Sequence, residues 1–239
     1  MKLKAMTYNI FSGRNLARDL NLDHAASVIR SVQPDFVVLN EVRSHTEDVG
    51  PVNQAQDLGR LTGYYPVFGK AIDILGGEYG NGFLSRLPVQ SVEVIHIPDA
   101  ERTGDYYYEH RCILRVVLLA NEQPFTVLAT HFGLAPAEQE LAVQTVLDLI
   151  AGDKNPVLLM GDLNAEPDAP VLRPLLEVLR DAAGGSGILT FPSGKPEIKI
   201  DHILYTKPFR VTDVYSIDTQ NSDHRPLIAH LELNANGVS

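Results

Sequence analysis

Polar side chains that could do chemistry stand at the ends of short apolar runs along the chain. The run Phe36–Leu39 leads into a glutamate, and the run Val157–Met160 leads into an aspartate and an asparagine. In layered α/β folds, ligands bind beyond strand ends, because the loops there converge without filling the crevice between them. The residues placed in this way are Asn9, Glu41, His131, Asp162, Asn164, Asp201, Asp223 and His224.

Three carboxylates in this set, Glu41, Asp162 and Asp223, are hard oxygen ligands of the kind that Mg²⁺ or Mn²⁺ prefers. Zinc would favour histidines and cysteines at tight spacing, and the sequence contains no HExxH or CxxC. The amides of Asn9 and Asn164 can hold phosphate oxygens or a metal-bound water without adding negative charge. Such a set suits metal-assisted attack of water on a phosphorus ester.

Two histidines complete this chemistry. His131 and His224 can donate hydrogen bonds to developing oxyanion charge, and a carboxylate such as Asp201 can orient one of the rings. The chain has no GxxxxGK[ST] phosphate loop and no GxSxG nucleophile motif, so other routes of phosphoryl or acyl transfer are not indicated. Taken singly, each residue has a structural alternative, such as a turn-forming aspartate or a buried histidine, and only the combination favours catalysis.

Strand and helix signals alternate along the whole chain and must position these residues. Helices are predicted after the capping residue Asn21, around Ala55–Leu61, from Pro136 to Gly152, and around Leu172, Leu175, Leu176 and Leu179. The predicted strands are Leu3–Ile10, Phe36–Leu39, Tyr65–Ile72, Asn81–Leu84, Val89–Ile97, Cys112–Leu119, Phe125–Thr130, Pro156–Met160, Ile200–Tyr205, Val211–Ile217 and Pro226–Leu233.

The middle of the chain is strand after strand with short loops, so the sheets must include antiparallel pairs. The predicted fold class is therefore α/β (α+β): a four-layer α-β-β-α sandwich of two mixed, largely antiparallel sheets flanked by helices. The sequence has no internal repeat, no low-complexity tract and no linker rich in Pro, Gly or Ser. We therefore expect a single domain over residues 1–239.

Composition limits the possible functions. The chain has 239 residues, of which 44% are hydrophobic and 21% charged, as in ordinary globular proteins. Its one cysteine, Cys112, cannot form an internal disulfide, and no apolar run approaches the ~18 residues of a membrane helix. Because the sequence opens on a strand signal and shows no charged-then-apolar leader, we expect a cytoplasmic location, unless a leader has been removed. We also expect a monomer.

The charge balance bears on the partners of the protein. The chain carries 20 basic and 30 acidic residues, a net charge of −10, and has no run of Lys or Arg. Binding of long nucleic acid is therefore disfavoured, although not excluded, because such binding depends on neutralising many phosphates.

Seven short blocks spread along the chain carry a resemblance to a known family. In chain order the blocks are Met6–Ile10, Pro34–Val42, Tyr79–Arg86, Thr130–Phe132, Gly161–Asn164, Ile200–Ile203 and Ser222–Pro226. Together they resemble the endonuclease/exonuclease/phosphatase superfamily, which has the deoxyribonuclease I-like fold. The resemblance implies a four-layered sandwich and Mg²⁺-dependent hydrolysis of phosphoesters.

The resemblance also implies roles for the site residues. Glu41 is similar to the principal metal ligand, with Asn9 beside it and Asp223 as a second carboxylate on the metal side. Asp162 resembles the group that positions or deprotonates the attacking water, and Asn164 resembles a contact to phosphate or water. The remaining assignments are a phosphate-binding histidine at His131 and a stabilising or activating histidine at His224, oriented by Asp201. Whether Asp162 or His224 is the general base stays open.

Two positions depart from the family pattern. Asn40 stands where a glutamine usually precedes the metal-binding glutamate, which shortens a side chain expected to brace the site. Leu141 lies near the place of an arginine found in many bacterial members. Neither departure removes a catalytic group.

We therefore predict a Mg²⁺-dependent phosphoesterase, with Mn²⁺ as a possible substitute, that prefers a phosphodiester in a small or lipid-like substrate. The alternatives are a nuclease that acts on DNA or RNA, and a non-catalytic binding module of the same fold. Tyr106–Tyr108 are candidates for a wall of the substrate site, in a polar loop that could equally be a solvated one. Candidates for a second anion contact are Arg14, Arg86, Arg102 and Arg111.

Overall fold

Two six-stranded sheets pack face to face, with helices outside both. The computed structural model describes residues 1–234, and residues 235–239 of the predicted domain lie outside the described part. The first sheet has the order β11 (Phe209–Ser216), β12 (Leu227–Leu233), β1 (Lys2–Asn9), β2 (Phe36–Ser44), β4 (Gly77–Ser85) and β3 (Tyr65–Ile74). The second has the order β5 (Val89–His96), β6 (Cys112–Ala120), β7 (Gln123–His131), β8 (Val157–Asp162), β10 (Asp201–Tyr205) and β9 (Arg180–Asp181).

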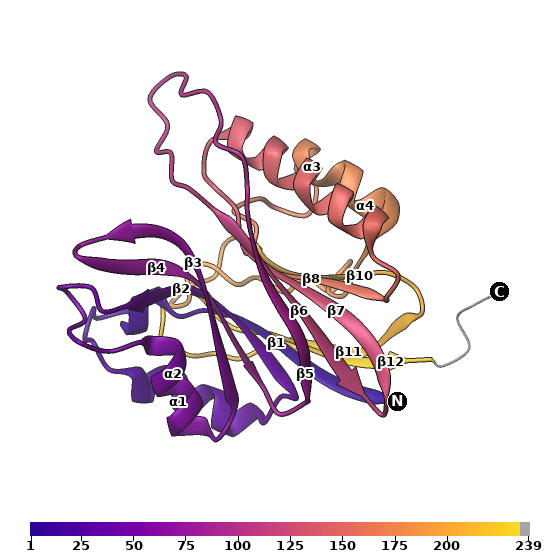
Figure 1. The fold of residues 1–239 in the computed structure, drawn as a ribbon, viewed down its shortest axis with the longest axis horizontal. Helices are drawn as coiled ribbons and strands as arrows, with labels where there is room; N and C mark the ends of the chain where they lie inside the picture. The colour runs from indigo at the N-terminus through magenta and orange to yellow at the C-terminus, as the bar shows by residue number, and fades with distance from the viewer. Residues whose placement is uncertain (235–239) are drawn as a thin grey trace.

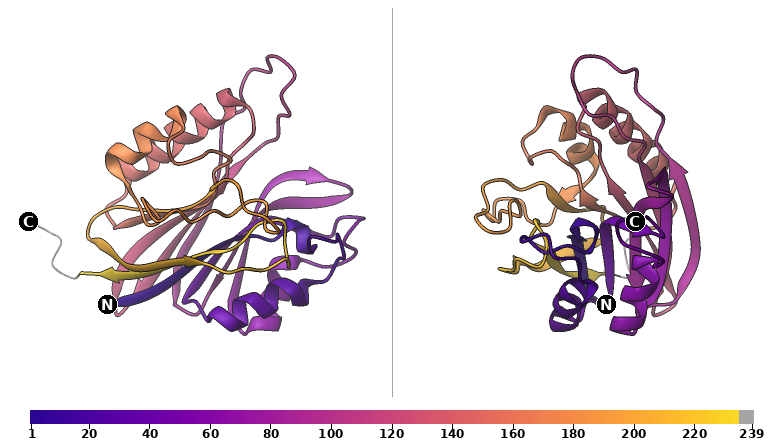
Figure 2. Two further views of the ribbon diagram at one scale, coloured as in Figure 1. Left: turned by 180° about the vertical axis from the view of Figure 1, so that it is seen from behind. Right: turned by 90° about the vertical axis from the view of Figure 1, so that its left-hand side faces the viewer.

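The helices form the two outer layers. In Figure 1, α1 (Leu22–Val32) and α2 (Gln54–Thr62) lie below the first sheet, while α3 (Pro136–Gly152) and α4 (Arg173–Val178) lie above the second. Figure 2 shows these layers from behind and from the side. The pairs β1–β2 and β7–β8 are parallel, and the other pairs between named strands of residues 1–234 are antiparallel. The predicted four-layer sandwich of mixed sheets is thus confirmed.

Alternation along β2 shows how a continuous apolar run serves two cores. Phe36 and Val38 face the core between the sheets, whereas Val37 and Leu39 pack against the helix layer. Successive side chains of a strand point to opposite faces, so a strand covered on both sides must be apolar throughout. A third core lies between the second sheet and α3 and α4.

Local signals begin and end the helices as predicted. Asn21 caps α1, its side-chain oxygen accepting a hydrogen bond from the Asp23 amide at 2.9 Å. Gly63 ends α2 in the left-handed conformation, with φ of 78°. Pro136 occupies the first turn of α3, where its missing N–H costs nothing.

One predicted helix and two predicted strands differ from the structure, and of the strands the one predicted over Asn81–Leu84 extends over Gly77–Ser85. The helix predicted around Leu172–Leu179 divides into a short 3₁₀ turn, η2 (Pro170–Leu172), and the six-residue α4. Leu176 is exposed rather than buried, because α4 is too short to bury a full helical face. The strand predicted to stop at Leu39 continues to Ser44 through the polar residues that follow. Within residues 1–234, no helix is long and apolar enough to span a membrane.

Candidate active site

All of the predicted site residues meet at one end of the sandwich. They come from the ends of β1, β7 and β8, the start of β10, the middle of β2, and the loops after β8 and before β12. A cavity of about 480 Å³ lies at this end. Glu41, His131, Asp162, Asn164, Asp223 and His224 line it. Asn9 and Asp201 are fully buried behind them.

A bulge in β2 aims Glu41 at the cavity. Leu39 pairs with Gly82 and Val42 pairs with Gly80, so two residues of β2 stand opposite the single residue Asn81. Glu41 takes a φ of 58° there, which is unusual for a residue with a side chain. The bulge explains how an acid in the middle of a strand reaches a site made mostly of strand ends.

Asn40, the other residue of the bulge, joins the two sheets. Its Nδ2 donates to Asn81 Oδ1 at 2.9 Å and to the Thr130 carbonyl at 2.8 Å. Its Oδ1 accepts a hydrogen bond from the backbone amide of Asp162 at 3.0 Å. All the polar atoms of this buried amide therefore have partners, and the brace expected at this position is complete with the shorter asparagine.

Gly161 allows the backbones of the parallel strands β7 and β8 to approach each other closely where they reach the site. Its φ is 145°, and a Cβ atom there would lie 1.8 Å from the carbonyl oxygen of Thr130. Only glycine fits such a close approach of two backbones. The register then places Asp162 directly beside His131.

Asn9 ties the acids of both sheets together. Its Nδ2 donates to Glu41 Oε1 at 3.2 Å and to Asp162 Oδ2 at 3.1 Å. Its carbonyl accepts a hydrogen bond from Ser222 Oγ at 2.7 Å, and that hydroxyl in turn accepts one from the backbone amide of His224 at 3.2 Å. The loop before β12 is thereby fixed against the end of β1.

His224 lies between two carboxylates. Its Nδ1 is 2.9 Å from Asp201 Oδ2, and its Nε2 is 3.6 Å from Asp162 Oδ2. Burial alone would lower the pKa of His224, but Asp201, Asp162 and Asp223 together raise the pKa to about 10. His224 is therefore a charged imidazolium at neutral pH, with the ring of Phe191 packed against it at 4.8 Å between centroids.

His131 faces the same carboxylate from the other side. Its Nε2 is 3.5 Å from Asp162 Oδ2, but its Nδ1 is 3.0 Å from Nη1 of Arg111. Burial, the charge of Arg111 and the charge of His224 hold the pKa of His131 well below its usual range. His131 is therefore neutral where His224 is charged.

Glu41 and Asp223 form the part of the site best suited to a metal ion. Burial and the charge of Asp223 raise the pKa of Glu41 to about 7, against the hydrogen bond from Asn9. Burial also raises the pKa of Asp223. A divalent cation would relieve this unfavourable negative charge, so the residues fit a hard metal.

Asp162, Asp201 and His224 form a second group whose ligand atoms lie within 4.8 Å of one another. The charged His224 ring already donates a hydrogen bond to Asp201 and forms an ion pair with Asp162 at 3.6 Å. A protonated imidazole has no lone pair for a metal ion, so this group is a weaker candidate.

The polar loop Asp99–Arg111, at the top of Figure 1, contributes Tyr107, Glu109 and Arg111 to the cavity wall. Of the arginines proposed as anion contacts, only Arg111 is among the residues that line the cavity. The prediction was wrong for Arg14, which pairs with Asp48, and for Arg86, which pairs with Asp35. Their partners lie 34 and 51 residues away along the chain, so local sequence patterns do not reveal these pairs. Arg102 borders a separate, smaller pocket.

The sequence analysis missed the apolar part of the wall. Leu134, Phe191, Ile198 and Ile200 line the cavity together with Tyr79. Nothing in their residue types distinguishes them from core residues. Only the block around Asp201 hinted that neighbouring residues such as Ile200 would lie near the site.

A buried ionic chain supports the site from behind. Lys199 Nζ donates to Asp181 Oδ2 at 3.1 Å and to His202 Nδ1 at 2.8 Å. His202 Nε2 therefore carries the proton and donates to the carbonyl of Ala165 at 2.9 Å. Burial and the charge of Lys199 lower the pKa of His202, which keeps it neutral. This chain holds the loop that follows Asp162 against the start of β10.

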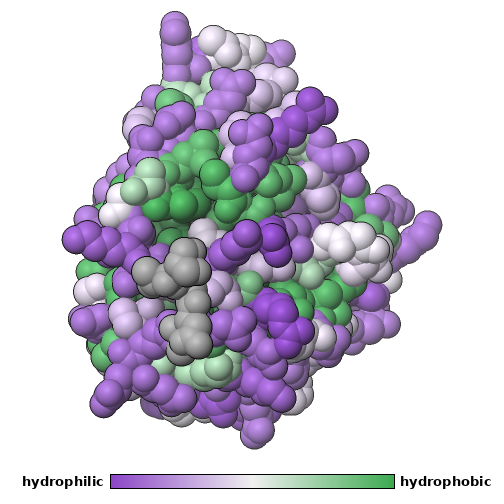
Figure 3. Space-filling model, turned by 90° about the vertical axis from the view of Figure 1, so that its right-hand side faces the viewer, coloured by the Kyte–Doolittle hydropathy of each residue, from purple (hydrophilic) through white to green (hydrophobic). Residues whose placement is uncertain are grey.

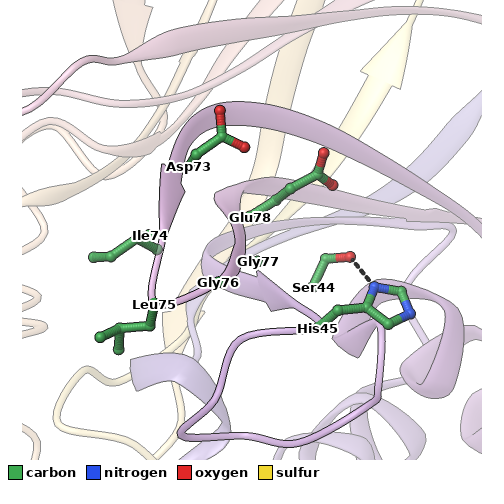
Figure 4. Close-up of a pocket in the computed structure, with 8 residues that line it drawn as sticks. All are labelled: Ser44, His45, Asp73, Ile74, Leu75, Gly76, Gly77 and Glu78. Carbon is green, nitrogen blue, oxygen red and sulfur yellow. Dashed lines mark hydrogen bonds between the residues drawn. The ribbon is translucent and has the colours of Figure 1, made fainter.

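Two further cavities lie away from these residues. One of about 670 Å³ lies at the tip of the β3–β4 hairpin, where Figure 4 shows the hydrogen bond between Ser44 and His45. Two acids of its wall, Asp73 and Glu78, pair with Lys70. Another, of about 600 Å³, lies between α3 and η2. Figure 3 shows apolar side chains gathered over the part of the surface where Figure 1 places α3 and α4. Neither cavity contains the predicted site residues.

A two-sheet sandwich with acids, amides and histidines gathered at one end is the arrangement that the resemblance to the endonuclease/exonuclease/phosphatase superfamily implies. The chain matches the model of the Endonuclease/Exonuclease/phosphatase family over residues 6–224, and it belongs to that family. No match was found among curated proteins.

Solved structures share the fold. A protein described as an endonuclease/exonuclease/phosphatase from Beutenbergia cavernae is 26% identical, with a TM-score of 0.80 over 100% of this chain and 73% of that chain. A mannosyl-6-phosphatase from Bacteroides thetaiotaomicron is 17% identical, with a TM-score of 0.73 over 97% of this chain and 100% of that chain. The catalytic domain of human nocturnin with bound sulfate is 19% identical, with a TM-score of 0.70 over 98% of this chain and 94% of that chain.

Proposed function

We propose that this protein is a Mg²⁺-dependent phosphoesterase that hydrolyses a phosphodiester bond in a small or lipid-like substrate by attack of water. The observation that carries the proposal is the placement of Asp162. Its Oδ2 lies 3.5 Å from His131 Nε2 and 3.6 Å from His224 Nε2, beside the acid Glu41. In this arrangement the carboxylate of Asp162 can accept a proton from the attacking water, while the two rings beside it donate hydrogen bonds to the phosphoryl oxygens.

Glu41 and Asp223, with the amide of Asn9, would hold the metal ion. When bound, Mg²⁺ supplies positive charge that polarises the phosphoryl group and offsets the acids around it. Asn9 keeps Glu41 and Asp162 at fixed positions relative to each other through its two donated hydrogen bonds.

Asp162 is the better general base. His224 is an imidazolium at neutral pH, so its Nε2 has no lone pair to accept a proton from water. Burial raises the pKa of Asp162, which makes its carboxylate a stronger base than an exposed one. His224 then donates to the negative charge that develops on the phosphoryl oxygens, and Asp201 keeps it charged.

Charge around the cavity supports a small phosphodiester. The chain has a net charge of −10, which repels every phosphate beyond the one at the metal. Arg111, the one arginine among the lining residues, is already paired with Glu109 at 2.9 Å. The other positively charged group of the wall, His224, is paired with Asp201 at 2.9 Å, so the second negative charge of a phosphomonoester would gain no unpaired cation from these two side chains. Tyr107, Leu134 and Phe191 offer apolar surface to the rest of the substrate.

A panel of substrates tests the proposal at one concentration of Mg²⁺. It comprises bis(p-nitrophenyl) phosphate, p-nitrophenyl phosphate, a phospholipid, a short oligonucleotide and plasmid DNA. We expect hydrolysis of the small diester or the phospholipid, little turnover of the monoester, and no activity after treatment with a chelator. Efficient plasmid nicking that falls steeply with added salt would identify a nuclease instead. No turnover on any substrate with Mg²⁺ or Mn²⁺ would indicate a binding module.

A further inference from the structure

Arg111 and His131 make a buried contact that fixes the hydrogen-bonding role of the histidine. Nη1 of Arg111 lies 3.0 Å from Nδ1 of His131, and the two residues are 8% and 6% exposed. A guanidinium has five donors and no acceptor, and it keeps its proton in proteins. Nδ1 of His131 must therefore be the acceptor in this contact.

A neutral imidazole has one protonated and one bare ring nitrogen. Since Nδ1 of His131 is bare, the proton sits on Nε2, which faces the cavity and lies 3.5 Å from Asp162 Oδ2. The side chain of His131 thus presents a hydrogen-bond donor to the site.

Arg111 is itself held in place by Glu109, which is in turn bonded to the helix layer. Its Nη1 pairs with Glu109 Oε1 at 2.9 Å, and the backbone amide of Glu109 donates to Glu138 Oε1 at 2.9 Å. Glu138 lies in the first turn of α3 and is buried. The polar loop before β6 is thus anchored to the helix layer close to the contact with His131.

We propose that Arg111 is a positioning residue that locks His131 in the Nε2–H tautomer, so that His131 acts as a neutral donor to a phosphoryl oxygen. The tautomer is a property of the folded chain, and only its use in catalysis rests on the function proposed above. This role differs from a direct anion contact, because Arg111 acts through His131 and its positive charge is paired with the carboxylate of Glu109.

Ring-nitrogen NMR of ¹⁵N-histidine-labelled, metal-free protein tests the lock without any need for turnover. In the wild type we expect His131 to show a protonated Nε2 and a bare Nδ1, with the signals assigned by their loss in His131→Gln. Arg111→Met should mix the two tautomers, whereas Arg111→Lys keeps a charged donor and should preserve the Nε2–H form. A wild-type His131 with a protonated Nδ1 would overturn the proposal even if the Arg111 variants do not fold. A single Nε2–H form in a folded Arg111→Met would also overturn it.

Kinetics separate positioning from direct binding. On a small phosphodiester, Arg111→Met should lower kcat roughly tenfold, the worth of one hydrogen bond, with KM little changed and recovery in Arg111→Lys. Arg115→Met is the matched control, since Arg115 lies in β6, four residues after Arg111, and pairs with Asp153 at 2.7 Å instead of lining the cavity. A rise in KM alone, largest for a phosphomonoester, would make Arg111 an anion contact and contradict the proposal. If no substrate is turned over, the NMR result still decides the tautomer.

Discussion

The two histidines on opposite sides of the cavity have pKa values shifted in opposite directions. His131 and His224 both direct Nε2 at the same oxygen of Asp162, at 3.5 and 3.6 Å. Behind His131 stands a guanidinium at 3.0 Å, and behind His224 stands a carboxylate at 2.9 Å. The pKa of the first ring is lowered, and the pKa of the second is raised to about 10. Burial lowers the pKa of both rings, so the opposite charges of the partners on Nδ1 are what distinguish them: Arg111 lowers the pKa of His131 further, and Asp201 raises the pKa of His224.

The fold makes this asymmetry possible because each ring is backed by a different part of the second sheet. His131 ends β7, and Arg111 directly precedes the neighbouring strand β6. His224 comes from the loop before β12 and reaches across to Asp201 at the start of β10. The following predictions test whether the two rings have the different roles that this arrangement implies.

The largest effect is expected at the carboxylate that both rings share. Asp162→Asn should lower turnover of the small phosphodiester by at least ~10²-fold, because the amide cannot accept a proton from water. The melting temperature should change little, since the variant keeps the size of the side chain. Asp148→Asn, an exposed acid of α3, is the matched control and should keep full activity. Near-normal turnover of Asp162→Asn would remove Asp162 from the proposed role.

Matched glutamine variants of the two histidines test the asymmetry directly. His224→Gln should lose ~10²-fold in turnover, because glutamine can donate a hydrogen bond but cannot carry positive charge. His131→Gln should lose no more than about tenfold, because a neutral donor is replaced by a neutral donor. Equal losses in steady-state assays of the two variants would show that the difference in charge has no catalytic use.

Asp201→Asn is expected to change the pH profile. Asp201 helps to raise the pKa of His224 to about 10, so its removal must lower that pKa. In the wild type the charged ring is present below pH 10 and is lost as the pH rises through that value. The alkaline limb of kcat should therefore move to lower pH in the variant, and activity near pH 9 should fall more than activity near pH 6. An unchanged alkaline limb would show that activity does not depend on a charged His224.

The smallest expected effect is a thermal shift on metal binding. Within residues 1–234 no ion pair holds Glu41, and burial and the charge of Asp223 raise its pKa to about 7, so its ionised form destabilises the metal-free protein above that pH. Mg²⁺ at a hundredfold excess over Kd should raise the melting temperature by roughly 5–10 °C at pH 8. The rise should be smaller at pH 6, where a proton competes for the carboxylate. Glu41→Gln should lose most of the shift, and an equal shift in this variant would place the metal elsewhere.

Local pattern was enough to predict most of the framework. Apolar runs such as Phe36–Leu39 gave the strands, and Asn21 and Gly63 marked helix ends, because these signals act over a few residues. The extension of β2 was missed because a bulge there depends on pairing with β4 rather than on the residues of β2 alone. The helix predicted around Leu172–Leu179 is divided between Leu172 and Arg173, where Pro174 stands in the first turn of α4 and lacks a backbone N–H.

The sequence by itself determined which polar residues follow apolar runs, since this is a local feature, and most of them stand at strand ends; Glu41 is the exception, because β2 continues past it to Ser44. It also determined the order of the family blocks. Only the tertiary structure decided the charge states and the tautomer, because the deciding partners are distant along the chain. Arg111 is 20 residues from His131, Asp201 is 23 residues from His224, and Asn9 reaches Asp162 across 153 residues. A pKa depends on distances in space, and a residue pattern does not contain them.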